Sequence, residues 1–105
     1  MIDKSTIQQV LGGLIKHPQY LSQSDKYQFQ VNDFSNRFEK MIYIAVYNLY
    51  QNGARKIQPI DIENYFEADK SSKLFFEQNN GVQYLQDIED FVDEGNFDYY
   101  YSKLK

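Results

Sequence analysis

The sequence predicts an all-α fold, and three observations carry this prediction. Apolar residues recur at intervals of three and four along most of the 105-residue chain, which is the spacing of one face of a helix. Ser, Asn or Asp stands just before several of these apolar stretches, as at the N-termini of helices. No stretch favours a strand over a helix, and there is no internal repeat. The length suits one domain with a single modest core.

The first predicted helix begins near the N-terminus. Ser5 followed three residues later by Gln8 has the form of a capping box, in which each side chain bonds the backbone of the other. Pro18 cannot continue a helix and therefore predicts its end. One apolar stripe runs along the helix between these limits, formed by Ile7, Val10, Leu11, Leu14 and Ile15.

Two consecutive glycines, Gly12 and Gly13, lie in the middle of this helix. Each costs about 1 kcal/mol relative to Ala in a helix interior. Because the apolar stripe continues in phase through them, we expect close packing: without side chains, they let a neighbouring helix approach, and we expect that neighbour to be the helix over residues 36–51. The alternative is a local kink.

The central part of the chain predicts a long helix. Residues 20–31 carry only a weak pattern, which indicates a short helix or a turn. Asn36 and Glu39 then form a second capping box, and Gly53 is a typical residue just after a helix end, so the helix runs to residue 51. Residues 41–47 are apolar on all sides, which predicts a central helix covered on several faces. A buried strand would also suit them, but the length and both caps favour a helix.

Further helices follow in the second half. Asp61 is the predicted N-cap of the next one, with Ile60 and Tyr65 placed to form a hydrophobic staple. A short apolar segment surrounds residues 74–76, and residues 79–81 break the chain. The helix after that break ends near residue 95, and its apolar residues are Val82, Leu85, Ile88 and Val92.

The aromatic residues divide into a predicted core and a candidate contact surface. The core set consists of Phe34, Phe38, Tyr65, Phe66, Phe75 and Phe76. A second apolar row recurs at helical spacing to the end of the sequence, with no later element to cover it: Phe97, Tyr100, Tyr101 and Leu104. We interpret this row either as core or as a contact to a partner or another subunit.

Acidic residues cluster on the helix before that row, at Asp87, Glu89, Asp90, Asp93 and Glu94. Several of them lie four residues apart and are therefore neighbours on the helix surface. They form either a solvated outer face or a docking patch for a basic partner. Their spacing does not match a calcium-binding EF-hand loop.

Composition excludes several function classes. A net charge of -4 with scattered basic residues argues against direct tight binding of nucleic acid. The absence of Cys excludes thiolate metal sites, and no phosphate-binding glycine loop is present. The one His, His17, stands beside Pro18 at a helix end, where a capping or solvent-facing role is expected. We therefore predict a protein that is not an enzyme, with no catalytic, cofactor or metal site.

The expected location and partners follow from the same composition. No apolar run approaches the roughly 20 residues of a membrane span, and the N-terminus lacks the layout of a signal peptide. We expect a cytoplasmic protein without a membrane partner. Ten Tyr and eight Phe supply a large apolar surface with polar tips, which favours protein partners.

Four short motifs occur in an order that resembles a known family. Residues 7–15 (IQQVLGGLI) are similar to the "E-x-x-V-L-G-x-L" opening of the N-terminal domain of DnaB-family replicative DNA helicases. Residues 32–34 (NDF), followed by Arg37, resemble its "x-D-F-x-x-x-x-H-x-x-I-F" segment. Residues 59–62 (PIDI) resemble "P-(I/V)-D-(L/V)", and residues 81–85 (GVQYL) resemble "G-G-x-x-Y-L". The resemblance covers nearly the whole chain.

The sequence departs from the family pattern at several positions. Gln8 stands where the family often has an acidic residue, and Glu39 and Lys40 lie near its usual His. Asn80 replaces the first Gly of the "G-G" pair. These departures indicate a divergent member, of the kind that a phage or mobile element encodes.

The resemblance implies a compact orthogonal bundle of helices and a domain organisation. Residues 1–95 would form the collar domain, and residues 96–105 would begin a helical hairpin that pairs subunits, or a linker. An ATPase domain using ATP and Mg would follow, so the sequence looks like an excised domain.

The function implied is non-catalytic: the domain would support hexamer formation, or dimer formation as a fragment, and would offer a surface to primase or a helicase loader in DNA replication. A free-standing adaptor or loader that binds a helicase is the alternative. A Walker motif in the gene after Lys105 would favour the first reading, and a stop codon the second.

Overall fold

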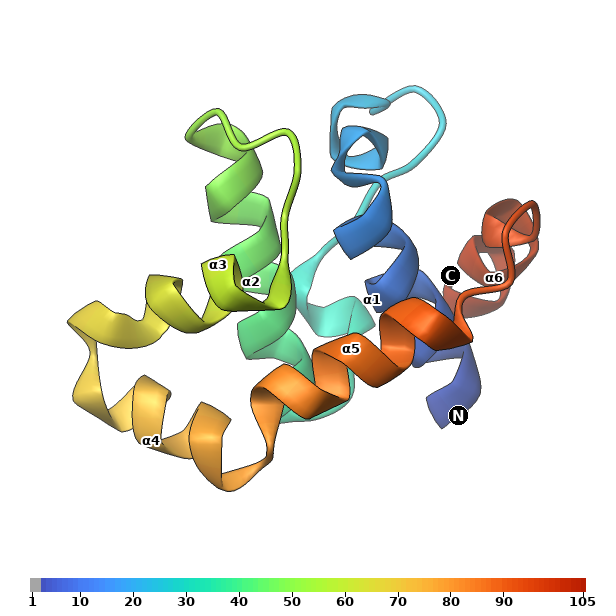
Figure 1. Cartoon of the computed structure of the whole chain (residues 1–105). Helices are drawn as coiled ribbons and strands as arrows, with labels where there is room; N and C mark the ends of the chain where they lie inside the picture. Colours follow the sequence, from blue (N-terminus) through green and yellow to red (C-terminus); the bar gives the residue numbers. More distant parts are fainter. Residues whose placement is uncertain (1–2) are drawn as a thin grey trace.

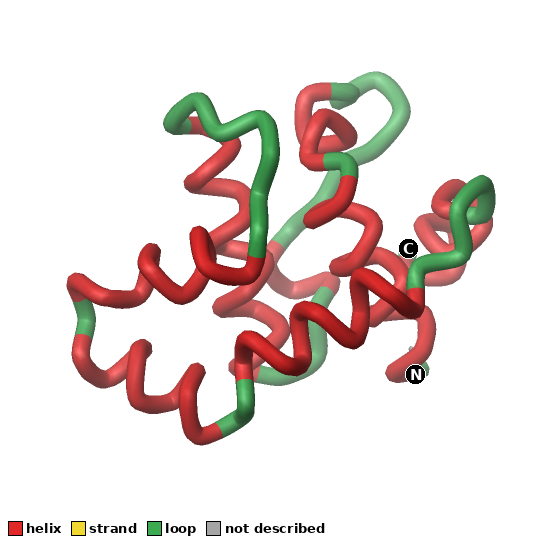
Figure 2. Tube along the Cα trace, in the orientation of Figure 1, coloured by secondary structure: helices red, strands yellow, loops and turns green. Residues whose placement is uncertain are grey.

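Six α-helices occur within the residues that the structure describes (Figure 1). The computed structural model describes residues 3–105, and no strand occurs in that span (Figure 2). The helices are α1 (Lys4–Lys16), α2 (Arg37–Gln51), α3 (Pro59–Tyr65), α4 (Lys70–Gln78), α5 (Gly81–Phe91) and α6 (Phe97–Leu104). Three 3-10 helices lie between them: η1 (Pro18–Ser22), η2 (Val31–Asp33) and η3 (Phe66–Ala68). The predicted all-α class is confirmed.

The central helix is α1. It lies between α2 and α6, and α5 crosses it at a steep angle (Figure 1). Nine of its thirteen residues are buried, including Gly12 and Gly13. The expectation that residues 41–47 of α2 form the centre is therefore wrong.

Helix α2 has the predicted ends, but it is more exposed than the apolar run of residues 41–47 predicts. Asn36 Oδ1 accepts a hydrogen bond from Glu39 N at 2.8 Å, and Glu39 Oε1 accepts one from Asn36 N at 3.1 Å. Gly53 has the left-handed conformation expected after a helix end, with φ of 105°. However, Ile44 is 38% exposed and Tyr47 is 40% exposed. These two residues lie three apart on the face opposite the buried part of the helix, so α2 is covered on one side.

Two predicted helix starts are corrected. At α1 the N-cap is Asp3, whose Oδ1 accepts from Thr6 N at 2.7 Å, so the helix begins before Ser5 and the expected Ser5 box is absent. At α3 the N-cap is Gln58, because Pro59 suits the first helical position. Asp61 instead lies in the first turn, where its carboxylate accepts from Gln58 N at 2.8 Å.

The predicted staple at α3 is also shifted by this earlier start. Ile60 is half exposed and does not serve as the staple residue. Ile57 precedes the cap and Ile62 is at the fourth helical position, and both are buried in the core.

The break at residues 79–81 is confirmed, since Asn80 adopts a left-handed conformation between α4 and α5. Residues 20–31 contain the end of η1 and the start of η2 with a loop between, in agreement with a short helix or turn. The radius of gyration, 12.8 Å, is that of a compact domain of this length.

Candidate interaction surfaces

The two glycines of α1 are sites of close helix approach. A methyl group at Gly12 would lie 2.5 Å from Val92 Cγ2 and 2.6 Å from the carbonyl oxygen of Ile88. A methyl group at Gly13 would lie 2.6 Å from Cδ1 of the Phe97 ring. The neighbours are thus the end of α5 and the start of α6, and the expectation that α2 would be the neighbour is wrong.

The apolar row of α6 faces its own domain. Leu104 is 3% exposed, and Phe97 and Tyr100 are partly buried against the core. The Phe97 ring stacks on Tyr20 with 4.1 Å between centroids, and the Tyr101 ring lies edge-on to Tyr27 at 5.1 Å. No later element covers this row, but earlier parts of the chain, α1 and the loop after it, pack over it.

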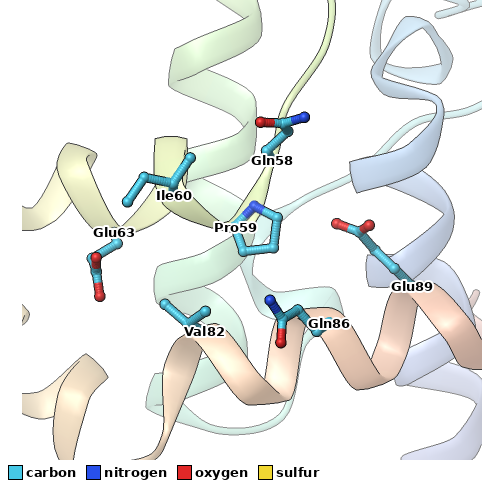
Figure 3. A pocket seen from close by; sticks show the side chains of 7 residues that line it. All are labelled: Gln58, Pro59, Ile60, Glu63, Val82, Gln86 and Glu89. Atoms are coloured by element: carbon cyan, nitrogen blue, oxygen red, sulfur yellow. The ribbon is translucent and has the colours of Figure 1, made fainter.

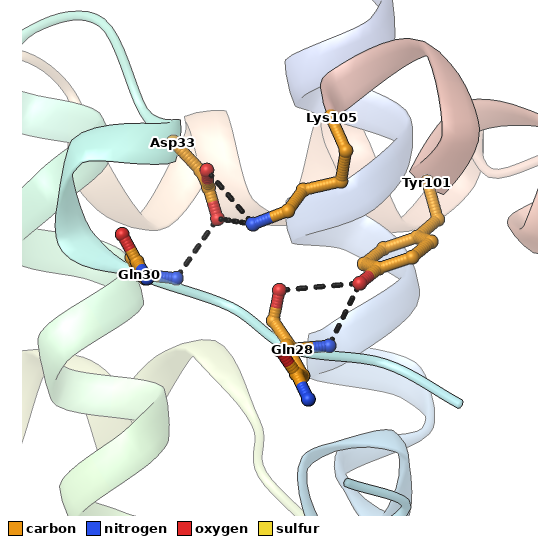
Figure 4. Close-up of polar contacts among 5 residues, drawn as sticks. All are labelled: Gln28, Gln30, Asp33, Tyr101 and Lys105. Atoms are coloured by element: carbon orange, nitrogen blue, oxygen red, sulfur yellow. Dashed lines mark hydrogen bonds and ion pairs between the residues drawn. The ribbon is translucent and has the colours of Figure 1, made fainter. Parts of the chain in front are cut away.

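Polar contacts also hold α6 to the loop at residues 26–33. The Tyr101 hydroxyl accepts from Gln28 N and donates to Gln28 O, and Lys105 Nζ lies 3.0 Å from Asp33 Oδ2 (Figure 4). The Tyr27 hydroxyl donates to the Asp98 carboxylate. This hydrogen bond, together with one from Lys26, lowers the pKa of Asp98. The C-terminal helix is thus tied to a loop about seventy residues earlier.

Tyr99, which is outside the predicted apolar row, lies on the outer face of α6. It is 59% exposed, and Lys103 Nζ lies 5.5 Å from the centre of its ring. The spacing of the inward row could have identified it, because residue 99 falls on the side of the helix opposite residues 97, 101 and 104.

A second exposed apolar surface crosses α2, and we call Val31, Ile44 and Tyr47 the α2 surface. A hollow of about 350 Å³ lies beside all three residues, and a hollow of about 470 Å³ lies beside Ile44, Met41 and Tyr65. The sequence pattern does not predict this surface. The stripe of Ile44 and Tyr47 continues at helical spacing into two polar residues, Lys40 and Gln51. This pattern indicates that the stripe is exposed to solvent.

The acidic cluster is divided among different neighbours. Glu94 lies 2.9 Å from Lys16 Nζ and 3.1 Å from His17 Nε2, and these partners lower its pKa. Asp93 accepts from the Asn96 side chain, and Asp87 accepts from Gln83 on the outer face of α5.

Glu89 is turned instead toward α3, where it lines a groove of about 440 Å³ between α3 and α5 (Figure 3). The groove lining consists of Gln58, Pro59, Ile60, Glu63, Val82, Gln86 and Glu89. Val82 and Gln86 point from α5 toward α3, and Glu63 points from α3 toward α5. We call this the α3–α5 groove.

The carboxylate of Glu89 is incompletely paired. Its Oε1 is buried and has no hydrogen-bond partner among residues 3–105. Burial raises the pKa of Glu89; Lys16 opposes this shift and Asp90 adds to it. A buried acceptor without a donor is uncommon, because it loses its bonds to water without replacement.

Other kinds of site are not seen in the part of the chain that the structure describes. No three His, Asp or Glu side chains are placed there to hold a metal ion. None of its helices has the length and apolar character that crossing a membrane requires.

Comparisons with known proteins identify the family. Residues 5–105 match the model of the DnaB-like helicase N terminal domain. The chain is 35% identical over 103 residues to the SPbeta prophage-derived uncharacterized protein YorI of Bacillus subtilis (strain 168), covering 98% of this chain and 20% of that protein. It thus spans about a fifth of the length of that relative, whose prophage origin fits the divergent, phage-related member expected from the sequence.

A solved structure agrees with this match. The fold is similar to the crystal structure of the N-terminal domain of DnaB helicase from Mycobacterium tuberculosis, with a TM-score of 0.75 and 20% identity. The match covers 97% of this chain and 69% of that chain, and at this identity it shows a shared fold. Because the family model covers nearly the whole sequence, the chain belongs to the DnaB-like helicase N terminal domain family, the non-catalytic part of the helicase.

Proposed function

We propose that this chain is an assembly and protein-interaction domain of a replicative DNA helicase. It supports formation of the hexamer and offers a surface to primase or to a helicase loader during DNA replication. The observation that carries this proposal is the family match over residues 5–105. Exposed apolar side chains at Tyr99 and on the α2 surface, together with the acidic residues of α5, can make the contacts that such a role needs.

Within this proposal, α6 belongs to the segment that pairs subunits. Residues 1–95 form the collar domain, and residues 96–105 begin the pairing segment. Because Phe97 and Leu104 hold α6 against α1, the partner meets its outer face, where Tyr99 is the largest exposed apolar side chain. Tyr is well suited to such a contact, since its ring is apolar and its hydroxyl tolerates water.

Sedimentation over a hundredfold range of concentration tests the proposal. We expect a monomer–dimer equilibrium for the wild type and a shift toward monomer for Tyr99→Asp, which places a charge in the contact. Ser71→Asp introduces the same charge at an exposed position of α4 and should leave the equilibrium unchanged. A wild type that stays monomeric at all concentrations would contradict self-assembly by this domain.

A free-standing adaptor that binds a helicase is the second candidate. The packing of α6 on α1 favours it, because this packing covers apolar residues that would otherwise be open to self-association. The adaptor predicts a monomer at all concentrations that forms a stable complex with the replicative helicase of its host. The assembly domain predicts concentration-dependent self-association without the helicase.

A further inference from the structure

Glu89 brings a carboxylate from α5 to the α3–α5 groove. Three of the other acidic residues on α5 and the turn after it bond partners on the surface: Asp87, Asp93 and Glu94. Glu89 lines the groove, and its Oε1 is buried without a partner in residues 3–105. Because Oε1 has no accessible surface, a donor from another molecule would bond the carboxylate through Oε2.

The rest of the groove indicates the chemistry of such a donor. Pro59, Ile60 and Val82 give it an apolar wall, and Ile60 is half exposed to solvent. Glu63 adds a second carboxylate from the opposite helix (Figure 3). The side-chain amides of Gln58 and Gln86 line the same groove and can bond a peptide backbone. Its volume, about 440 Å³, lies within the range of clefts that hold a few side chains.

We infer that the α3–α5 groove binds a segment of a partner protein that carries an arginine close to an aliphatic residue. The guanidinium donates to Glu89, and the aliphatic side chain packs on Pro59, Ile60 and Val82. This inference rests on the proposed function only in taking the occupant to be a protein. It assigns a site that is separate from α6 and from the α2 surface.

Arginine fits the groove better than lysine or a phosphate group does. Its planar fork has five N–H donors, and it gives up its hydration more readily than an ammonium group. Its three methylene groups also suit the apolar wall. A phosphate would meet the carboxylates of Glu63 and Glu89, and the net charge of -4 adds to that repulsion.

Titration of the full chain with a blocked leucine–alanine–arginine tripeptide, followed by amide NMR shifts, tests this inference. In an extended peptide the leucine and arginine side chains lie on the same side. We expect shifts that cluster at Ile60, Glu63, Val82, Gln86 and Glu89. The same peptide with citrulline in place of arginine keeps the shape without the charge, and it should bind at least about tenfold more weakly.

Two variants separate a binding role from a structural one. Glu89→Gln removes the charge in the groove and should weaken peptide binding by at least about tenfold, while its Tm stays equal to or rises above that of the wild type. Asp87→Asn removes the same charge outside the groove and should leave peptide binding unchanged.

Three binding results would overturn the inference: no shifts in the groove, equal binding of the citrulline peptide, or a Glu89→Gln variant that binds normally. A Glu89→Gln variant with a lowered Tm would show that the carboxylate serves the fold, which also contradicts it. Self-association measured on the same variants is a separate result. If Glu89→Gln loses the peptide but still self-associates, the groove is independent of subunit assembly, as inferred.

Discussion

Tyr101 and Gln28 form a reciprocal hydrogen-bonded pair between the C-terminal helix and a loop 73 residues earlier. The Tyr101 hydroxyl accepts from the backbone N–H of Gln28 at 2.8 Å and donates to its carbonyl at 3.2 Å. One phenol thus satisfies both backbone groups of a loop residue that lies outside any helix. Because backbone groups without partners are costly, this pair fixes the loop and α6 together.

Tyr101→Phe should therefore loosen α6 without removing its ring contacts. The substitution deletes the hydroxyl and leaves Gln28 without these two bonds, so we expect a loss of about 1 kcal/mol of stability. Amide hydrogen exchange should become faster in α6 and near residue 28. Tyr99→Phe removes a hydroxyl from the exposed face and should change neither quantity; equal effects of the two variants would contradict the pairing.

Low pH should weaken the attachment of α6 at its N-terminal end, where Asp98 lies. The hydrogen bond from Tyr27, and then Lys26, lower the pKa of Asp98 below its ordinary value of 3.8. A carboxyl group with a lowered folded-state pKa stabilises the fold above its unfolded pKa, and this contribution is lost as the pH falls through the folded value. We expect wild type to melt above Asp98→Asn near neutral pH, and the two Tm values to converge in acid. A constant difference across that range would show that ionised Asp98 does not contribute.

Two isoleucines of α2 give a matched test of how this helix is covered. Ile42 is fully buried and Ile44 is 38% exposed, two residues further along the same helix. Ile42→Ala should cost about 2–5 kcal/mol because it leaves a cavity in the core. Ile44→Ala should cost less than about 1 kcal/mol because its side chain is partly in water in the folded state. Urea denaturation measures both, and equal losses would mean that α2 is covered on both faces.

Local signals in the sequence predicted local structure well. The Asn36 and Glu39 box and Gly53 determine the ends of α2 through contacts within a few residues, so the pattern alone was sufficient. The start of α1 was misplaced because Asp3 and Ser5 are both good caps, and the choice depends on where the helix meets the core.

The same local signals do not predict which helices pack on one another. The apolar run of residues 41–47 contains more apolar residues than α1, yet α1 is central because α2, α5 and α6 all pack on it. For the same reason the sequence shows no later element to cover the apolar row that ends at Leu104, although an earlier part of the chain covers it. The position of Glu89 in a groove depends on α3, which no pattern within α5 can reveal.

The glycine pair gives the sharpest test of the packing around α1. At Gly12 a methyl group would meet the backbone carbonyl of Ile88, which can move only if α5 moves. At Gly13 it would meet the Phe97 ring, which is a partly buried side chain and not backbone. Alanine gains about 1 kcal/mol over glycine in helix propensity at either position, so any loss of stability measures the packing conflict.

We therefore expect Gly12→Ala to destabilise the fold by about 1–3 kcal/mol and Gly13→Ala by less. The larger Gly13→Leu should also destabilise it, by about 1–3 kcal/mol, because its side chain would occupy the place of the Phe97 ring and displace α6. Thermal melting ranks the three variants, and exchange of α6 amides locates the damage. If Gly12→Ala melts at or above the wild type, close approach of α5 does not explain why α1 carries glycine there, and the local kink becomes the better reading.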